Sequence, residues 1–319
     1  MSEPLFEVSG LPVTAYNLGL LVSLALVSVL AAIGLKKKGV EPRVLETFLI
    51  FVIPLGVILG RGMYVLIRLN FFLSWENALA LRFWQGGYSI WGLILAFLVA
   101  GIFAAKRTGI KPAALLDALV PYALLMLALG RFCEGLAGQG FGQEATDSLR
   151  FFPFAVVNEY EEWRYAIFML EGLAALLFIL PVMKQEAGTG NRTRLAVILF
   201  CASQILFESL RKDEVLSWGF VKASQMFSAI TLYALLVYGL YGHKNNAWKA
   251  PRHLAQASFF LLIFVIVGLE FALDKTNIDT NIIYLVMAAV CLGLCLVTAR
   301  CALKRQDWPA PSIKAAPSI

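Results

Sequence analysis

The chain has 319 residues, of which 60% are hydrophobic and 15% are charged. A soluble domain of this length does not have such a composition, which instead indicates an all-α polytopic membrane protein. The net charge of +6 is no signal for nucleic-acid binding, because most of the basic residues lie in short loops between apolar runs. The two histidines and five cysteines form no metal-ligand spacing, so neither a metal nor another cofactor is expected.

Nine apolar runs have roughly the length that is needed to cross a bilayer, which predicts about nine transmembrane helices. The first run is preceded by no Lys or Arg, so we expect it to remain as a span rather than to be cleaved as a signal peptide. The fourth and seventh runs are the least apolar. In chain order, the runs lie near residues 14–35, 46–67, 87–105, 113–130, 165–183, 194–211, 223–242, 255–273 and 282–300.

The orientation follows from the loops that follow odd-numbered runs, because these loops hold most of the Lys and Arg residues and should be cytoplasmic. The N-terminus is then outside and the C-terminus is cytoplasmic. Arg61, Arg131, Arg164 and Arg211 differ, because they lie at or within run ends on the outer half. The aromatic-rich outer segments 68–86 and 131–164 are expected in the membrane interface. The inner loop 184–194 reads as a plain polar turn, and the Pro-rich tail is expected to be disordered.

The segment GRFCEGLAGQGFGQ at 130–143 lies where the fourth apolar run stops. Arg131 and Glu134 are three residues apart and therefore share one helix face. An arginine and a carboxylate beside an amide-rich turn at a membrane boundary predict a lipid-phosphate site. The alternative is a helix C-terminus with a solvated charge and a glycine cap. Four glycines allow backbone N–H groups to approach a ligand closely, namely Gly135, Gly138, Gly140 and Gly142.

Ionisable residues inside apolar runs are functional candidates, because a charge near the bilayer centre costs about 2.5–3.5 kcal/mol. Arg61, Arg131 and Arg211 lie at similar depth, and guanidinium groups recognise phosphate by paired hydrogen bonds. The alternative is internal ion pairing, for example Arg61 with Glu208 or Arg131 with Glu134. The whole set, with neighbouring amides, is Arg61, Asp117, Arg131, Glu171, Gln204, Glu208, Arg211, Gln225 and Glu270. Glu270 has no basic residue near it in the sequence, which favours a structural role.

Several short motifs follow Tyr16 along the chain: LGRGMYVL at 59–66, RFWQGGYSIWG at 82–92, GRFCEGLAGQGFG at 130–142 and FESLR at 207–211. Together they resemble the prolipoprotein diacylglyceryl transferase family, bacterial membrane enzymes that move a diacylglyceryl group from phosphatidylglycerol to a lipobox cysteine. The resemblance covers roughly residues 14–242. It implies a seven-span transferase-like membrane domain at 1–242. Outside the resemblance, we expect an additional C-terminal transmembrane hairpin at 243–300 and a cytoplasmic tail at 301–319.

The departures from the family pattern concern proton-handling positions. The family's histidine in the third motif is Trp91 here, its signature asparagine is Glu134, and its glutamate is Gln139. The arginine that the family has four residues before Glu208 is Gln204. The two histidines, His243 and His253, lie in a basic loop that should face the cytoplasm, so neither replaces the missing imidazole.

The resemblance implies an enzyme at the outer face of a bacterial plasma (inner) membrane. Its substrates would be phosphatidylglycerol, or a similar anionic phospholipid, and a prolipoprotein with a lipobox. Arg131, Glu134 and Glu208 are the expected catalytic residues, with Glu134 or Glu208 as the base. The expected substrate-binding residues are Arg61, Arg131, Arg211, Tyr16, Tyr64, Gln139, Gly138 and Gly142.

Two other readings stay open from the sequence. A divergent paralogue would keep the phospholipid pocket but use another acceptor, or bind lipid without catalysis; Trp91 and Glu134 favour this reading. A transporter or channel would also contain intramembrane charges. However, the sequence shows neither repeated halves nor a pair of broken helices, and the charges gather at the outer face rather than at the midplane.

Overall fold

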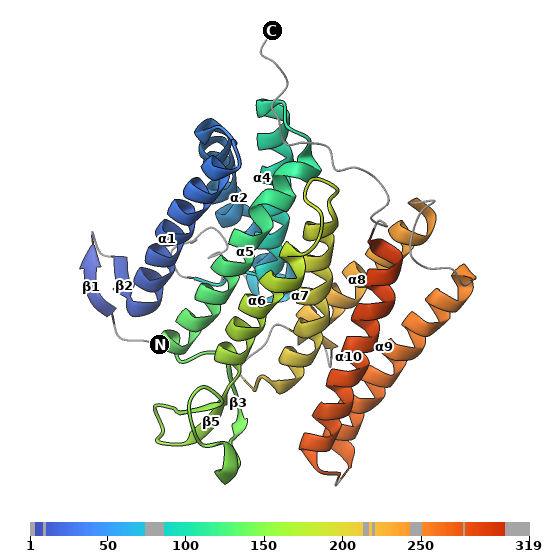
Figure 1. Cartoon of the computed structure of the whole chain (residues 1–319). Coiled ribbons are helices and arrows are strands. Elements are labelled where there is room, and N and C mark those ends of the chain that lie inside the picture. The colour runs from blue at the N-terminus through green and yellow to red at the C-terminus, as the bar shows by residue number, and fades with distance from the viewer. Residues whose placement is uncertain are drawn as a thin grey trace.

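The computed structural model is mainly helical (Figure 1), and it describes residues 4–8, 11–73, 86–212, 217–218, 221–242, 251–276 and 278–303. Each of the nine predicted runs contains one helix. The helices are α1 Ala15–Lys37, α2 Pro42–Ile67, α4 Ile90–Thr108, α5 Pro112–Glu134, α6 Ile167–Met183, α7 Asn191–Leu210, α8 Ala223–Gly242, α9 Arg252–Lys275 and α10 Thr280–Ala302, with the short α3 Leu69–Phe72 between α2 and α4. The predicted all-α polytopic membrane fold is confirmed.

In the described part of the chain, eight helices are long and apolar enough to cross a membrane. The ninth, α6, is apolar but has only 17 residues. The RFW motif at 82–84, the loop around His243 and the tail from residue 304 lie outside the described residues.

The helix ends follow from local sequence. Helices α2 and α5 begin at Pro42 and Pro112, where the missing N–H needs no partner and the fixed φ suits a first turn. Helix α4 ends at Gly109, which has a left-handed φ of 69°. The loops after α1, α4 and α6 lie together at the upper end of Figure 1, as the charge pattern predicts. Which side of the membrane this end faces stays a prediction.

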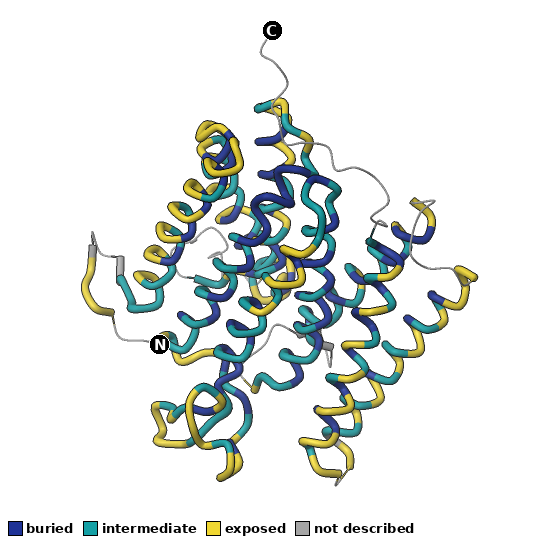
Figure 2. Tube along the Cα trace, viewed as in Figure 1, coloured by how far each residue is buried: buried dark blue, intermediate teal, exposed yellow. Residues whose placement is uncertain are grey.

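Helices α5 and α7 form the buried centre of the bundle, whereas α1 and α9 expose much of their surface (Figure 2). Helix α10 packs against α7 and α8, so the C-terminal hairpin shares one hydrophobic core with them. Helices α8 and α10 approach very closely, because a Cβ on Gly239 would collide with the backbone of Cys301. The C-terminal hairpin is thus packed into the bundle.

The outer segment 131–164 contains strands, which its sequence pattern did not predict. Strands β3 Phe141–Glu144, β4 Ala155–Val157 and β5 Trp163–Ala166 form an antiparallel sheet in the order β3-β5-β4. This sheet lies at the lower end of Figure 1. The placement of Arg164 at a span end was wrong, because Arg164 lies in β5 opposite Val156, and α6 begins only at Ile167. The remaining strands are β1 Pro4–Val8, β2 Leu11–Thr14, β6 Ser217–Trp218 and β7 Val221–Lys222.

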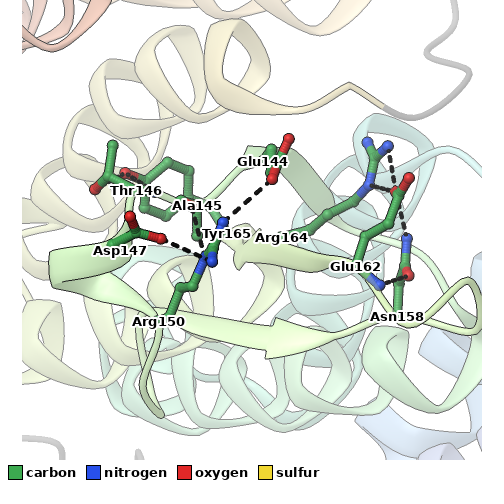
Figure 3. Close-up of polar contacts among 9 residues, drawn as sticks. All are labelled: Glu144, Ala145, Thr146, Asp147, Arg150, Asn158, Glu162, Arg164 and Tyr165. Carbon is green, nitrogen blue, oxygen red and sulfur yellow. Dashed lines mark hydrogen bonds and ion pairs between the residues drawn. The ribbon is translucent and has the colours of Figure 1, made fainter.

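The sheet segment carries its own polar network, which Figure 3 shows in two groups. In one, Arg150 pairs with Asp147 at 2.7 Å and with Glu144 at 3.2 Å. In the other, Arg164 pairs with Glu162 at 2.8 Å. Hydrogen bonds from Arg164 and Asn158 hold the pKa of the Glu162 carboxyl below its ordinary value. These charged side chains therefore have partners of opposite charge within the sheet segment.

The loop 184–194 is not a plain polar turn. Asp117, which is fully buried in α5, accepts hydrogen bonds from the backbone N–H groups of Gly188, Gly190 and Thr193 at 2.8–3.0 Å. The Thr193 hydroxyl donates to the same carboxylate at 2.8 Å. Asp117 therefore anchors the start of α7 to α5, and the structure explains this buried charge without a ligand.

Candidate functional site

The guanidinium of Arg131 is the centre of a buried polar cluster at the end of α5 nearest the three-stranded sheet. Its Nη1 lies 2.5 Å from Glu134 Oε1, and its Nη2 donates to Gln204 Oε1 at 3.3 Å. Its Nε lies 2.6 Å from Glu171 Oε2, close enough for an ion pair although not aligned as a hydrogen bond. Only 10% of the Arg131 side chain is exposed. One arginine thus joins α5, α6 and α7.

A second guanidinium, that of Arg211, borders the same carboxylates. Its Nη2 lies 3.1 Å from Glu134 Oε2 and its Nη1 lies 3.6 Å from Glu171 Oε2. Arg211 follows directly on the last residue of α7, where the backbone turns to an extended conformation. Two arginines and two glutamates therefore alternate around one buried point.

Helix α7 extends the cluster through amide and carboxylate groups. Gln204 donates from Nε2 to Glu208 Oε1 at 3.1 Å, while its Oε1 accepts from Arg131. The Lys222 ammonium donates to the backbone carbonyl of Glu208 and, at 3.4 Å, to that of Arg211. Burial lowers the pKa of this ammonium, and the charges of Glu208 and Glu270 oppose that shift.

Local spacing explains part of this arrangement. Arg131 and Glu134 are three residues apart on α5, and Gln204 and Glu208 are four apart on α7, so each pair shares a helix face. Glu171 reaches Arg131 because α5 and α6 approach closely beside it. A Cβ on Gly172 would collide with the ring of Phe132, so only glycine fits at this crossing.

The cluster combines three carboxylates with two guanidinium groups and the Lys222 ammonium. Glu134, Glu171 and Glu208 face two guanidinium groups, and all of these side chains are largely buried. Glu171 Oε1 and Glu208 Oε2 are buried and have no hydrogen-bond partner among the described residues. Both oxygens can therefore accept a hydrogen bond from a bound ligand.

A small crevice of about 10 Å³ lies between α5, α6 and α7 beside this cluster. Its polar end is formed by Arg131, Glu171 and Gln204. Its walls are apolar, with Phe178, Phe200 and Phe207 among them. The crevice places aromatic side chains beside the guanidinium of Arg131, the kind of group that recognises an anionic head group.

The predicted catalytic residues Arg131, Glu134 and Glu208 and the predicted binding residue Arg211 are brought together by the structure. The alternative pairing of Arg131 with Glu134 is also present. Tyr16 lies in the first turn of α1, where the charges of Glu134 and Arg131 act on its hydroxyl. Helix α1 packs against α5 here, because Gly19 leaves room for Cys133.

Arg61 and Tyr64 belong to a second set of contacts on α2. The Arg61 guanidinium donates to the carbonyl oxygens of Gly86 and Gly87, the latter at 3.2 Å. It also lies 5.4 Å from the ring centre of Tyr64 and 5.5 Å from that of Phe72. Gly87 has a φ of +73°, and a Cβ there would lie 2.7 Å from Arg61 Nη1. In these contacts, Arg61 fixes the segment that enters α4.

The glycines of the segment 130–143 mostly allow neighbouring side chains and backbone to pack closely. A Cβ on Gly140 would lie 2.6 Å from Phe168 Cβ, and one on Gly142 would lie 3.1 Å from the Leu210 carbonyl oxygen. Gly138 and Gln139 differ, because both are exposed and Gly138 faces open space. Their predicted role in substrate binding stays a prediction.

Trp91, which replaces the family histidine, lies in the hydrophobic core. Its ring packs against Phe200 and Phe227 at centroid distances of 5.8 and 5.7 Å. Its Nε1 is buried and meets no hydrogen-bond partner in the described part of the chain. An indole does not exchange protons near neutral pH, so this position supplies no base.

Glu171 and Gln204 were the residues that the sequence-based site omitted. Both had been recognised as polar groups within apolar runs, which is the only local signal that they carry. Their convergence on Arg131 depends on the crossing of α5 with α6 and α7, which no spacing along the chain reveals.

The fold and site define a polytopic helical membrane protein with an arginine–carboxylate cluster buried where three helices meet a three-stranded sheet. A family model for prolipoprotein diacylglyceryl transferase matches residues 3–241. The chain belongs to that family.

Several relatives carry the name phosphatidylglycerol–prolipoprotein diacylglyceryl transferase. The protein of Frankia alni is 25% identical over 225 residues, which cover 66% of this chain and 58% of that protein. That of Bacillus velezensis is 23% identical, with coverages of 63% and 78%. That of Streptococcus pneumoniae is 26% identical, with coverages of 80% and 99%. This chain thus spans less than two thirds of the Frankia protein but nearly all of the Streptococcus one.

Proposed function

We propose that this protein transfers the diacylglyceryl group of phosphatidylglycerol to the cysteine of a prolipoprotein at the outer face of a bacterial plasma membrane. Membership of the family and the names of its relatives support the reaction. The single structural observation that carries the proposal is the pair of buried guanidinium groups, Arg131 and Arg211, that share the carboxylates of Glu134 and Glu171 where α5, α6 and α7 meet.

In this reaction, the cysteine sulfur forms a bond to the glyceryl carbon. The bond from that carbon to the phosphate oxygen breaks, and glycerol phosphate leaves with the electron pair. Arg131 and Arg211 stabilise the charge that develops on the leaving phosphate. The thiol proton passes to a carboxylate of the cluster, because the thiolate rather than the thiol is the nucleophile.

Glu208 is the best placed base. One of its oxygens is held by Gln204, while the other is buried and has no donor in the described structure. Glu134 is less suitable, because both of its oxygens lie beside guanidinium groups. The negative phospholipid also adds to a cluster that already has three carboxylates. Uptake of the thiol proton by Glu208 removes one negative charge from the cluster during the reaction.

A second candidate function is phospholipid binding without this transfer, or transfer to another acceptor. The observation that favours it is the hydrophobic environment of Trp91, where the family has its histidine. Complementation of a bacterial strain depleted of its own transferase separates the two functions. Growth and lipoprotein maturation on expression of this chain are expected. Failure to restore maturation by a protein that still binds phosphatidylglycerol vesicles would favour the second function.

Arg150→Ala is the matched control for complementation by variants, because Arg150 is an exposed arginine of the sheet segment with carboxylate partners of its own. It should restore maturation as well as the parent chain does. Arg131→Lys should not, because an ammonium cannot reproduce the two hydrogen bonds and the ion pair of the guanidinium at once.

A further inference from the structure

Glu270 lies in α9, beyond the residues that the family model matches, yet it contacts two helices of the family core. One of its oxygens accepts hydrogen bonds from the Ser209 hydroxyl and, at 2.6 Å, from Gln225 Nε2. Gln225 also donates to Ser209 Oγ at 2.9 Å and to the Ile205 carbonyl at 3.2 Å. A single carboxylate of the C-terminal hairpin thus ties α7 to α8.

Helix α10 adds a second contact at the same point. The hydroxyl of Tyr284, which is 9% exposed, donates to the Ser209 carbonyl oxygen at 3.3 Å. Ser209 itself is 3% exposed. Both helices of the hairpin therefore converge on this one residue of α7.

Ser209 follows Glu208 and precedes Arg211 by two residues, so its backbone sets where both side chains point. The end of α7 has carbonyl groups without helical partners, and Lys222 donates to two of them. The charge of Glu270 acts on the same ammonium as that of Glu208.

We propose that Glu270 is a positioning residue of the transfer site: together with Tyr284 it fixes, through Ser209 and Gln225, the end of α7 that presents Glu208 and Arg211. The proposal rests on the proposed transfer function for its kinetic consequences. A positioning role of Glu270 would make the C-terminal hairpin part of the transfer site, although the hairpin lies outside the family match. Tight positioning matters because a displacement of about 1 Å can reduce a rate about a hundredfold.

The test compares Glu270→Leu, Glu270→Gln and Gly268→Ala in the purified full-length protein, with kcat and KM for phosphatidylglycerol as readouts. Glu270→Leu removes the acceptor and should raise KM and lower kcat, with kcat/KM reduced roughly ten- to hundredfold. Glu270→Gln keeps an acceptor oxygen and should restore most of the loss. Gly268→Ala, two residues away and facing open space, should behave as the parent chain does.

Three outcomes would overturn the proposal. The first is unchanged kinetics in Glu270→Leu. The second is a fall in kcat alone together with a lower melting temperature, which is the signature of a smaller folded fraction. The third is a failure of Glu270→Gln to restore activity.

Hydrogen exchange of the amides at residues 205–211 separates this proposal from the transfer function. If the parent chain has no transfer activity, faster exchange at these amides in Glu270→Leu than in Gly268→Ala still supports the positioning role. Equal exchange in the two variants contradicts it.

Discussion

Arg131 makes polar contacts with three side chains from three helix segments, and it is buried while doing so. Removal of one partner of a buried ion pair typically costs about 3–5 kcal/mol, because the other charge is left unpaired. Arg131→Ala would leave Glu134 and Glu171 to share Arg211. Arg131→Lys retains the charge, so its loss of function reports on the directed contacts rather than on unfolding.

At the residue scale, Glu208→Gln tests the assignment of the base. The amide oxygen still accepts from Gln204, but the side chain no longer takes a proton. We expect kcat to fall by about 10²–10⁴-fold, the usual contribution of general-base catalysis, while KM for phosphatidylglycerol changes little. Kinetics of the purified variant provide the measurement. Glu144→Gln in β3, an exposed carboxylate paired with Arg150, is the control.

Retention of normal kcat by Glu208→Gln would contradict this assignment. Glu134→Gln should instead act mainly on KM, because Glu134 pairs with both guanidinium groups and thereby sets their positions. The two variants thus separate proton transfer from phosphate binding.

At the element scale, the site depends on how closely α5 and α6 cross. The Glu171 carboxylate reaches Arg131 because Gly172, the next residue, lets the ring of Phe132 pack against the backbone of α6. The sheet segment then continues from α5 and returns to α6, with Phe168 N–H donating to the Gly140 carbonyl at 2.9 Å. This crossing and the sheet together place the arginines of α5 and α7 around the same carboxylates.

Gly172→Val should separate the two helices. Overpacking of this kind typically costs about 1–3 kcal/mol, and the shift should also weaken the Arg131–Glu171 pair. We expect a lower melting temperature and a higher KM for phosphatidylglycerol. Gly268→Ala in α9 has no atom within 4 Å of the added Cβ and should leave both quantities unchanged. Normal stability and kinetics of Gly172→Val would show that the crossing does not set the site.

At the scale of the whole molecule, hydropathy predicted each long helix, because the thickness of a bilayer imposes a length that a sequence window detects. The β3-β5-β4 sheet was missed, since its strands have only three or four residues and lack a clear alternation of polar and apolar side chains. The site was predicted as far as local spacing reaches, as with Arg131 and Glu134. Glu171, Gln204 and Glu270 needed the packing of distant helices.

The packing of the C-terminal hairpin also matters for the site. Because α10 shares a core with α7 and α8, the hairpin supports the helix that carries Glu208 and Arg211. The family match ends at residue 241, just before this hairpin. The molecule is therefore a family core with a C-terminal hairpin that contacts the end of α7.

Transfer of a labelled diacylglyceryl group to a lipobox peptide tests whether the cluster around Arg131 is catalytic. The purified protein is incubated with phosphatidylglycerol that is labelled in its diacylglyceryl group and with a peptide that contains a lipobox cysteine. We expect a labelled thioether peptide with the parent chain and with Arg150→Ala. With Arg131→Lys, we expect much less labelled peptide. Absence of labelled peptide at every pH tested, from a folded protein that binds phosphatidylglycerol, would contradict a catalytic role of the cluster.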